Sequence, residues 1–153
     1  MNGQLTIRIA QRDGFPGWKA QWDGYDAFYG RIGPTALPAD VTRMTRSRFF
    51  DAWEPMHTLV AEDSGGLLGL AHFLFHRRTI QIAPACYLQD PFTLEQARGR
   101  GVGPAPIGAV RARAIAAGSP RVHWQTDETN QAAMRLYDKV AGRSGFVVYR
   151  TTS

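Results

Sequence analysis

The central part of the sequence contains three consecutive segments with the composition of β-strands: His57–Glu62, Leu67–Arg77 and Ala85–Thr93. The middle segment is apolar on both of its alternating faces, although it carries one histidine. A strand with one face in water would instead alternate apolar and polar residues. We therefore expect a central strand with both faces buried, which restricts the fold to a sheet that carries helices on both faces.

A short connection, Asp63-Ser64-Gly65-Gly66, joins the first two of these segments, and its residue types favour a tight turn. Strands joined by so short a turn pair in antiparallel orientation. The three segments are therefore expected to form an antiparallel meander.

The residues before the meander are predicted to form one strand and two helices. Leu5–Ala10 alternates well enough for a strand. Residues 16–32 place aromatic side chains at spacings near three and four, which is typical of a helix packed on an apolar surface, and Gly33 ends it. A second helix is expected over about residues 38–53.

After the meander the apolar period becomes helical over residues 104–117. A strand over Arg121–Thr126, a helix over Asn130–Ala141 and a last strand over Phe146–Thr151 are expected to follow. The predicted fold class is thus α/β, with a mixed sheet and helices on both faces. The chain has 153 residues, of which 44% are hydrophobic, and this suits a single domain over residues 1–153.

Several classes of function are disfavoured by the composition. The longest apolar stretch, Leu67–Phe75, is far shorter than the roughly 20 residues that cross a bilayer, and the N-terminus does not resemble a secretion signal. We therefore expect a cytoplasmic protein with no membrane partner. The single cysteine, Cys86, cannot form an internal disulfide, and no histidine has partners at ligand spacing, so no metal is expected.

The net charge of +5 favours an anionic partner, which charge alone leaves open among nucleic acid, a lipid surface and a phosphorylated cofactor. The most informative basic stretch is Arg98-Gly99-Arg100-Gly101-Val102-Gly103, between a predicted strand and a predicted helix. Glycines allow close approach of the backbone, and the free N–H groups of a helix N-terminus attract a pyrophosphate. Taken alone, this stretch is equally compatible with a solvated loop. Only the charge supports nucleic-acid binding, and we do not expect nucleic acid as a partner.

Three motifs resemble those of GCN5-related N-acetyltransferases (GNAT). Arg98-x-x-Gly101-x-Gly103 resembles the Arg/Gln-x-x-Gly-x-Gly/Ala signature with which this family holds the pyrophosphate of acetyl-CoA. Upstream, Tyr87-Leu88-Gln89-Asp90-Pro91-Phe92-Thr93 resembles the Tyr-Leu-Glu-Asp-Phe-Phe-Val strand of spermidine/spermine and small histone/polyamine acetyltransferases. Downstream, Asn130 and Tyr137 fall where the family has its late asparagine and tyrosine.

The resemblance implies the GNAT fold, a mostly antiparallel sheet with a splayed strand pair. It also implies an enzyme that transfers acetyl from acetyl-CoA directly to a primary amine of a small molecule or a protein. The residues that it implies for cofactor binding are Phe92, Thr93, Leu94, Arg98, Gly99, Arg100, Gly101, Val102, Gly103 and Asn130.

The catalytic roles follow from the same resemblance. Tyr137 is expected to act as the general acid, because a tyrosine with its ordinary pKa of about 10 stays protonated at neutral pH. Asp90 is a candidate base, directly or through water, and is equally compatible with a structural role. Glutamine cannot usefully accept a proton, and Gln89 stands where the polyamine enzymes have glutamate.

The acceptor amine and the partners are less constrained. Acidic and aromatic side chains suit a cationic amine, although core packing explains the aromatic ones equally well. A homodimer is expected, because the family commonly has one further strand and a second subunit can complete the sheet edge. The alternative to an enzyme is an acyl-CoA-binding relative with little turnover that acts as a sensor, as Gln89, Pro104 and Pro106 would allow. The residues expected to form the acceptor wall are Trp22, Asp23, Tyr25 and Tyr29.

Overall fold

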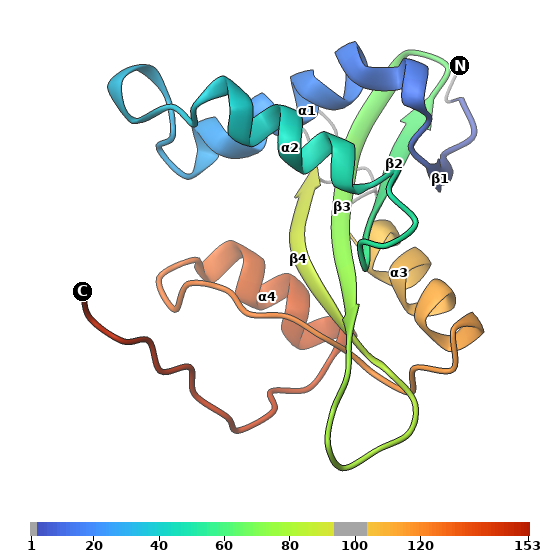
Figure 1. The fold of residues 1–153 in the computed structure, drawn as a ribbon, viewed down its shortest axis with the longest axis vertical. Helices are drawn as coiled ribbons and strands as arrows, with labels where there is room; N and C mark the ends of the chain where they lie inside the picture. Colours follow the sequence, from blue (N-terminus) through green and yellow to red (C-terminus); the bar gives the residue numbers. More distant parts are fainter. Residues whose placement is uncertain (1–2, 94–103) are drawn as a thin grey trace.

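The computed structural model describes residues 3–93 and 104–153, and the strands in this part of the chain form one five-stranded sheet (Figure 1). The strands lie in chain order, and all neighbours are antiparallel except the parallel pair β4 and β5. The predicted meander, with its second strand at the centre of the sheet, is confirmed. The strands are β1 (Thr6–Ile9), β2 (Met56–Asp63), β3 (Gly66–His76), β4 (Ala85–Thr93) and β5 (Val122–His123).

Helices cover both faces of β3, as predicted. On one face, α1 buries three aromatic side chains against Leu70 of β3, and Phe49 joins them after α2. On the other face, α3 packs apolar side chains against Ala71 and Phe73 of β3 and against Leu88 of β4. The helices are α1 (Phe15–Phe28), α2 (Ala39–Arg48), α3 (Ala105–Ala116) and α4 (Gln131–Val140), with short 3-10 turns at Arg12–Gly14 and Gly33–Thr35.

A β-bulge interrupts the pairing of β3 with β4. His72 pairs with Asp90, but the next residue, Phe73, pairs with Leu88, so Gln89 is an extra residue in β4. Side chains alternate between the faces of a strand, so a regular β4 would turn Asp90 to the same side as Leu88. The bulge instead turns Asp90 to the α1 side of the sheet, where His72 lies.

Strands β4 and β5 pair only at their beginnings, through Cys86 with Val122 and Tyr87 with His123. Beyond these pairs β4 continues to Thr93, whereas β5 ends. The expected splayed strand pair is therefore present, although the second of the two strands is shorter than the predicted Arg121–Thr126.

The C-terminal segment (residues 142–153) contradicts the prediction of a last strand over Phe146–Thr151. It is exposed throughout, has no helix or strand, and runs away from the sheet in Figure 1. Phe146 and Tyr149 are 91% and 92% exposed. Residues with high β-propensity form a strand only where a neighbouring strand supplies hydrogen bonds, and none of the described residues supplies them here. The predicted second helix was also too long, since α2 ends at Arg48.

The sequence led us to expect neither a membrane span nor a metal site. None of the helices in this part of the chain is long and apolar enough to cross a membrane. Among the same residues no group of three or more His, Cys, Asp or Glu side chains is arranged to hold a metal ion. Cys86 is fully buried, and burial raises the pKa of its thiol to about 11, which disfavours the reactive thiolate.

Candidate active site

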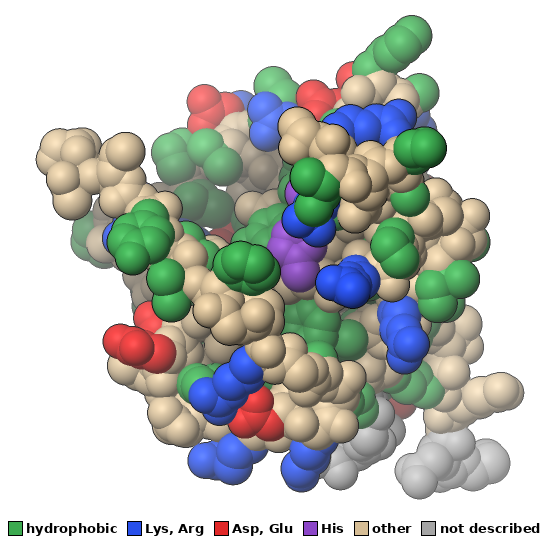
Figure 2. Space-filling model, turned by 90° about the horizontal axis from the view of Figure 1, so that it is seen from below, with side chains coloured by type: hydrophobic (Ala, Val, Ile, Leu, Met, Phe, Trp, Pro, Cys, Tyr) green, Lys and Arg blue, Asp and Glu red, His purple; other side chains and the backbone are tan. Residues whose placement is uncertain are grey.

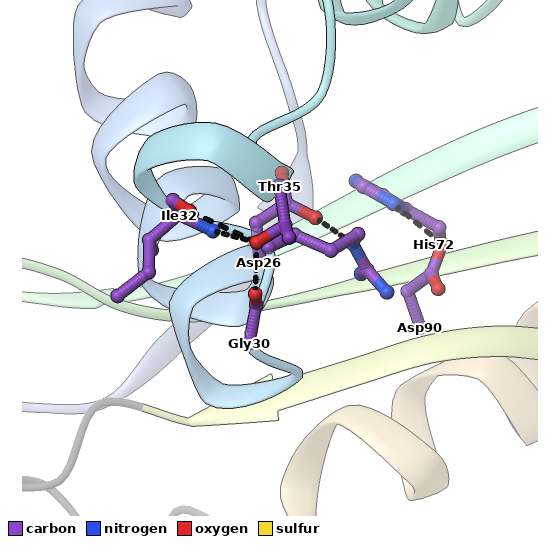
Figure 3. Close-up of polar contacts among 7 residues, drawn as sticks. Asp26, Gly30, Ile32, Thr35, His72 and Asp90 are labelled. Atoms are coloured by element: carbon purple, nitrogen blue, oxygen red, sulfur yellow. Dashed lines mark hydrogen bonds and ion pairs between the residues drawn. The ribbon is translucent and has the colours of Figure 1, made fainter.

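Asp90 and His72 face each other on the α1 side of the sheet (Figure 3). The Nδ1 atom of His72 lies 3.1 Å from Oδ2 of Asp90, and Nε2 of the same ring accepts a hydrogen bond of 3.0 Å from Nε1 of Trp18. Both His72 and Trp18 are essentially inaccessible to solvent, at 1% and 0% exposed. A continuous chain of hydrogen bonds thus runs from the helix α1 core to the Asp90 carboxylate.

Tyr25 approaches the same carboxylate from α1. Burial raises the pKa of Tyr25 above its ordinary value, and the negative charge of Asp90 and a hydrogen bond to it raise the pKa further. Both effects disfavour the phenolate, so Tyr25 remains a hydrogen-bond donor at neutral pH. Asp90 is therefore held between a histidine of β3 and a tyrosine of α1.

Arg31 follows α1 and places a positive charge beside Tyr25 and Tyr29. Its Nε atom lies 2.7 Å from Oδ1 of the buried Asp26. Its guanidinium carbon lies 5.4 Å from the ring centre of Tyr25 and 5.3 Å from that of Tyr29, within the range of cation–π contacts. Burial raises the pKa of Asp26, and the hydrogen bond and charge of Arg31 offset part of this rise.

The loop after α1 fixes the position of Arg31. Gly30 has a φ of 75°, a conformation that glycine adopts without strain, and it ends the helix. The hydroxyl of Thr35 donates to the carbonyl of Gly30 at 2.6 Å and accepts from the N–H of Ile32, which closes the loop on itself (Figure 3). The chain therefore turns back directly after Arg31.

Tyr137 lies on α4. Its ring packs edge to face on Trp124 with 5.4 Å between ring centres. Burial raises the pKa of Tyr137, and the nearby hydroxyl of Tyr29 adds to the rise. Tyr137 thus stays protonated at neutral pH, and it lies within electrostatic range of Tyr29.

The part of the chain between residues 19 and 142 matches the Acetyltransferase (GNAT) family. The chain belongs to this family. It is therefore an enzyme that transfers acetyl from acetyl-CoA to an amine, as the sequence motifs predicted. The expected GNAT fold is confirmed as well.

Relatives of this GNAT protein include one curated enzyme of similar length. The chain is 31% identical over 152 residues to the D-amino-acid N-acetyltransferase HPA3 of Saccharomyces cerevisiae, and the match covers 98% of this chain and 92% of that enzyme. Its fold is similar to that of the aminoglycoside N-acetyltransferase AAC(6')-Iy in complex with CoA, with a TM-score of 0.83 and 16% identity over 99% of this chain and 97% of that one. It is also similar to the ribosomal-protein-alanine N-acetyltransferase from Brucella melitensis biovar Abortus 2308, with a TM-score of 0.78 and 15% identity over 98% of this chain and 100% of that one.

Three of the site residues expected from the sequence, Tyr25, Tyr29 and Asp90, are in contact in this GNAT fold, and a fourth, Tyr137, lies within electrostatic range of Tyr29. Others have different surroundings. Trp22 is buried in the aromatic core, stacked between Trp18 and Tyr25 at 5.9 Å and 5.3 Å.

Asp23 and Asn130 interact with residues of their own helices, α1 and α4. Asp23 is exposed and forms an ion pair of 2.7 Å with Lys19. Asn130 caps α4, because its Oδ1 accepts a hydrogen bond of 3.2 Å from the N–H of Ala133. The binding roles of Trp22, Asp23 and Asn130 stay predictions.

Most of the predicted GNAT cofactor site, Leu94 and the stretch from Arg98 to Gly103, lies outside the described residues. Phe92 and Thr93 lie at the end of β4 and pair with β3. Because β5 ends at His123, the β4 edge beyond Tyr87 faces no β-strand among the described residues. An edge of this kind suits the added-strand pairing that the resemblance implies for the pantetheine.

Sequence reasoning missed two residues of this site: Arg31 and His72. His72 could have been recognised from the sequence, because it is a histidine within a strand that is apolar on both faces. A buried imidazole needs hydrogen-bond partners, which indicates a polar contact at this position. No such indication was present for Arg31, because the predicted first helix, residues 16–32, included it, whereas α1 ends at Phe28.

Proposed function

We propose that this enzyme acetylates the amino group of a free amino acid. An amino acid presents an ammonium group close to a carboxylate, so its site needs a proton acceptor next to a cation. Asp90 and Arg31 both interact with Tyr25, which brings an acceptor and a cation to one place, and this arrangement is the observation that supports the proposal most strongly. The 31% identity to a D-amino-acid N-acetyltransferase supports it independently.

Asp90 is proposed as the general base, directly or through one water molecule. An alkylammonium has a pKa of about 10 and must lose a proton before its nitrogen can attack. Gln89 cannot take this proton usefully, and the bulge at Gln89 turns the neighbouring carboxylate toward the α1 side where Tyr25 and Arg31 lie.

Tyr137 is proposed as the general acid. Acetyl-CoA supplies the acetyl thioester when it is bound, and its departing thiolate needs a proton. The hydroxyl of Tyr137 keeps its proton at neutral pH, because burial raises its pKa. The buried Cys86, with its raised pKa, is not suited to carry the acetyl group, which supports direct transfer to the amine.

The cofactor is proposed to lie along the β4 edge and the start of α3. The backbone of Phe92, Thr93 and Leu94 would pair with the pantetheine, and residues 98–103 would hold the diphosphate with help from Asn130. Pro104 precedes α3 and Pro106 lies in its first turn, so two N–H donors are missing from the start of this helix.

A panel of acceptors tests the amino-acid proposal. We expect turnover with D- or L-amino acids, and a KM at least about tenfold higher for the matching amino-acid amides, which lack the carboxylate that a bidentate arginine would bind. Arg31→Gln should raise the KM for the amino acid toward that for the amide and leave the amide unaffected. Arg48→Gln, on the surface of α2, is the matched control.

A polyamine acceptor is the competing outcome, in line with the resemblance of Tyr87–Thr93 to the spermidine/spermine enzymes. Spermidine as the preferred substrate, with a KM insensitive to Arg31→Gln, would refute the amino-acid proposal. Acetyl transfer itself would still be established by such a result.

We also infer that the enzyme is a homodimer that exchanges its C-terminal segments. Phe146-Val147-Val148-Tyr149 has strong β-propensity and is exposed, and β5 leaves an open edge of the sheet among the described residues. Each chain thus carries both a segment able to form a strand and an edge able to accept one. Such a pair of surfaces is self-complementary, and two copies related by a two-fold axis satisfy both.

Other exposed apolar side chains lie at the same end of the molecule. The connection between β3 and β4 projects there in Figure 1, and its Ile80 and Ile82 are 76% and 97% exposed. Seen from this end in Figure 2, apolar side chains lie at the surface among Lys and Arg side chains. A second copy would cover apolar surface that a monomer leaves in water.

A further inference from the structure

His72 occupies a position in β3 where an apolar residue would be expected. Its neighbours Ala71 and Phe73 are part of the core on the α3 side. On the α1 side, the rings of Trp18, Trp22 and Phe49 lie 5.8, 5.2 and 4.7 Å from the centre of the His72 ring. A polar group in such surroundings is tolerated only when its hydrogen bonds are made, and both ring nitrogens of His72 have partners.

These partners determine which ring nitrogen carries the proton. An indole N–H can only donate, so Nε2 of His72 must accept the hydrogen bond from Trp18 and carries no proton itself. The proton of the neutral ring then resides on Nδ1, which donates to Oδ2 of Asp90 at 3.1 Å. Trp18 thereby selects the tautomer that leaves a donor directed at the carboxylate.

We infer that Trp18 and His72 are positioning residues for acetyl transfer: they hold the Asp90 carboxylate, through a single imidazole tautomer, in the orientation in which it accepts the proton of the amine. This inference rests on the proposed role of Asp90 as the general base. His72 itself is 1% exposed and therefore does not reach a bound amine.

The surroundings of Asp90 give this hydrogen bond its importance. Tyr25 and Asp26 of α1 and Tyr87 of β4 interact with the charge of Asp90, since it contributes to the raised pKa of each. Tyr25 and His72 hold the carboxylate from two elements, and the His72 contact is shielded by aromatic rings. With side-chain exposures of 1% for His72 and 14% for Asp90, water has little access to this contact, which favours a geometry that persists while substrates enter and leave.

Two substitutions at position 72 separate the two hydrogen bonds. His72→Asn keeps a donor near the position of Nδ1 and loses the acceptor for Trp18, whereas His72→Gln keeps an acceptor near the position of Nε2 and loses the donor to Asp90. We expect His72→Gln to lower kcat at least about tenfold, a part of what general base catalysis contributes. We expect His72→Asn to retain kcat within about threefold, because the donor to Asp90 remains.

The pH dependence of kcat/KM distinguishes positioning from simple packing. A hydrogen bond to a carboxylate favours its ionised form. Its removal in His72→Gln should therefore move the acidic limb of the profile to higher pH, whereas His72→Asn should leave the limb in place. His76→Gln, four residues along the same strand, is the control and should match the wild type in both kcat and pH profile.

Asp90→Asn distinguishes failure of this inference from failure of the proposed base. If Asp90→Asn abolishes turnover while a folded His72→Gln keeps the wild-type kcat and acidic limb, the positioning role is refuted and the base stands. If Asp90→Asn retains full turnover, the base is refuted, and the positioning role with it.

The tautomer can also be measured in the unmodified enzyme, without relying on the folding of any variant. Long-range ¹H–¹⁵N correlation spectra of the histidine rings should show His72 protonated at Nδ1 alone. Protonation at Nε2 would overturn the inference. Trp18→Phe keeps an aromatic ring but removes the indole donor, and it should shift part of the His72 population to the other tautomer.

Discussion

Asp90 lies opposite His72 across the β3–β4 ladder because Gln89, which precedes it, bulges out of β4 and pairs with no residue of β3. If Gln89 paired regularly with His72, Asp90 would emerge on the α3 side together with Leu88, whereas the bulge keeps Asp90 on the α1 side. In this fold the face of the sheet on which Asp90 emerges therefore depends on how the backbone of β4 pairs with β3, and not on the side chain of Gln89.

Deletion of Gln89 should leave activity largely intact. It would restore a regular ladder in which Leu88 still pairs with Phe73 and Asp90 with His72, because neighbouring residues of a strand point to opposite faces. We expect kcat to stay within about tenfold of the wild type, short of the roughly hundredfold or more that loss of a general base costs. Gln89→Ala keeps the inserted residue and should stay within about threefold of the wild type. Thiol release from acetyl-CoA measures both, and a strongly impaired Gln89→Ala would show that the side chain matters instead.

Replacement of Tyr137 by phenylalanine should lower kcat by about a hundredfold, since a general acid contributes on that order. The ring contact with Trp124 remains in Tyr137→Phe, so the melting temperature should change little. Because the pKa of Tyr137 is raised, the acid form persists to high pH, and the wild-type rate should decline only above the ordinary tyrosine pKa of about 10. Tyr149→Phe, in the exposed C-terminal segment, is the control, and a Tyr137→Phe enzyme with unchanged kcat would exclude this residue from the mechanism.

The ion pair between Arg8 of β1 and Glu62 of β2 should make a small, pH-dependent contribution to stability. Its atoms lie 2.7 Å apart, and the hydrogen bond from Arg8 lowers the pKa of Glu62 below its ordinary value. A lowered pKa means that the folded state binds fewer protons than the unfolded state, so the contribution is present above the ordinary glutamate pKa of about 4.3 and is lost as the pH falls below it.

Urea unfolding of Glu62→Gln measures this contribution. The pair is partly exposed, and we expect a loss of about 0.2–1 kcal/mol at pH 7 that disappears in acid. Glu54→Gln, whose partner Arg48 lies at 3.8 Å, should show a smaller difference. An equal loss at acidic and neutral pH would mean that the effect does not come from the charge of Glu62.

A charge introduced into the C-terminal segment should dissociate the proposed dimer. Val148→Asp places a carboxylate in the segment that a partner's sheet would bury, and light scattering should then report a monomer where the wild type is a dimer. Thr152→Asp, beyond the apolar run, should leave the dimer intact. A wild-type chain that is monomeric at high micromolar concentration would refute the exchange and would favour a C-terminal segment that folds back on its own sheet.

The elements of this fold were largely predictable because their signals are local. The third meander strand was predicted over Ala85–Thr93 and has those bounds. The helix predicted over residues 104–117 is present as α3, and Gly118, with a φ of 80°, follows it. The apolar run of β3 identified the central strand, because a strand shows in its own side chains how many of its faces are buried. The motif Arg98-x-x-Gly101-x-Gly103 identified the family.

What the sequence alone determined is therefore the identity and order of the elements, since helical period, strand alternation and turn residues act over a few neighbours. The tertiary structure decided the chemistry around Asp90, because Trp18 and His72 are 54 residues apart and His72 and Asp90 are 18 apart. Whether residues 146–149 form a strand also depends on a distant partner, since β-propensity is expressed only against a neighbouring strand. Contacts of this kind are set by packing and register, which no local pattern encodes.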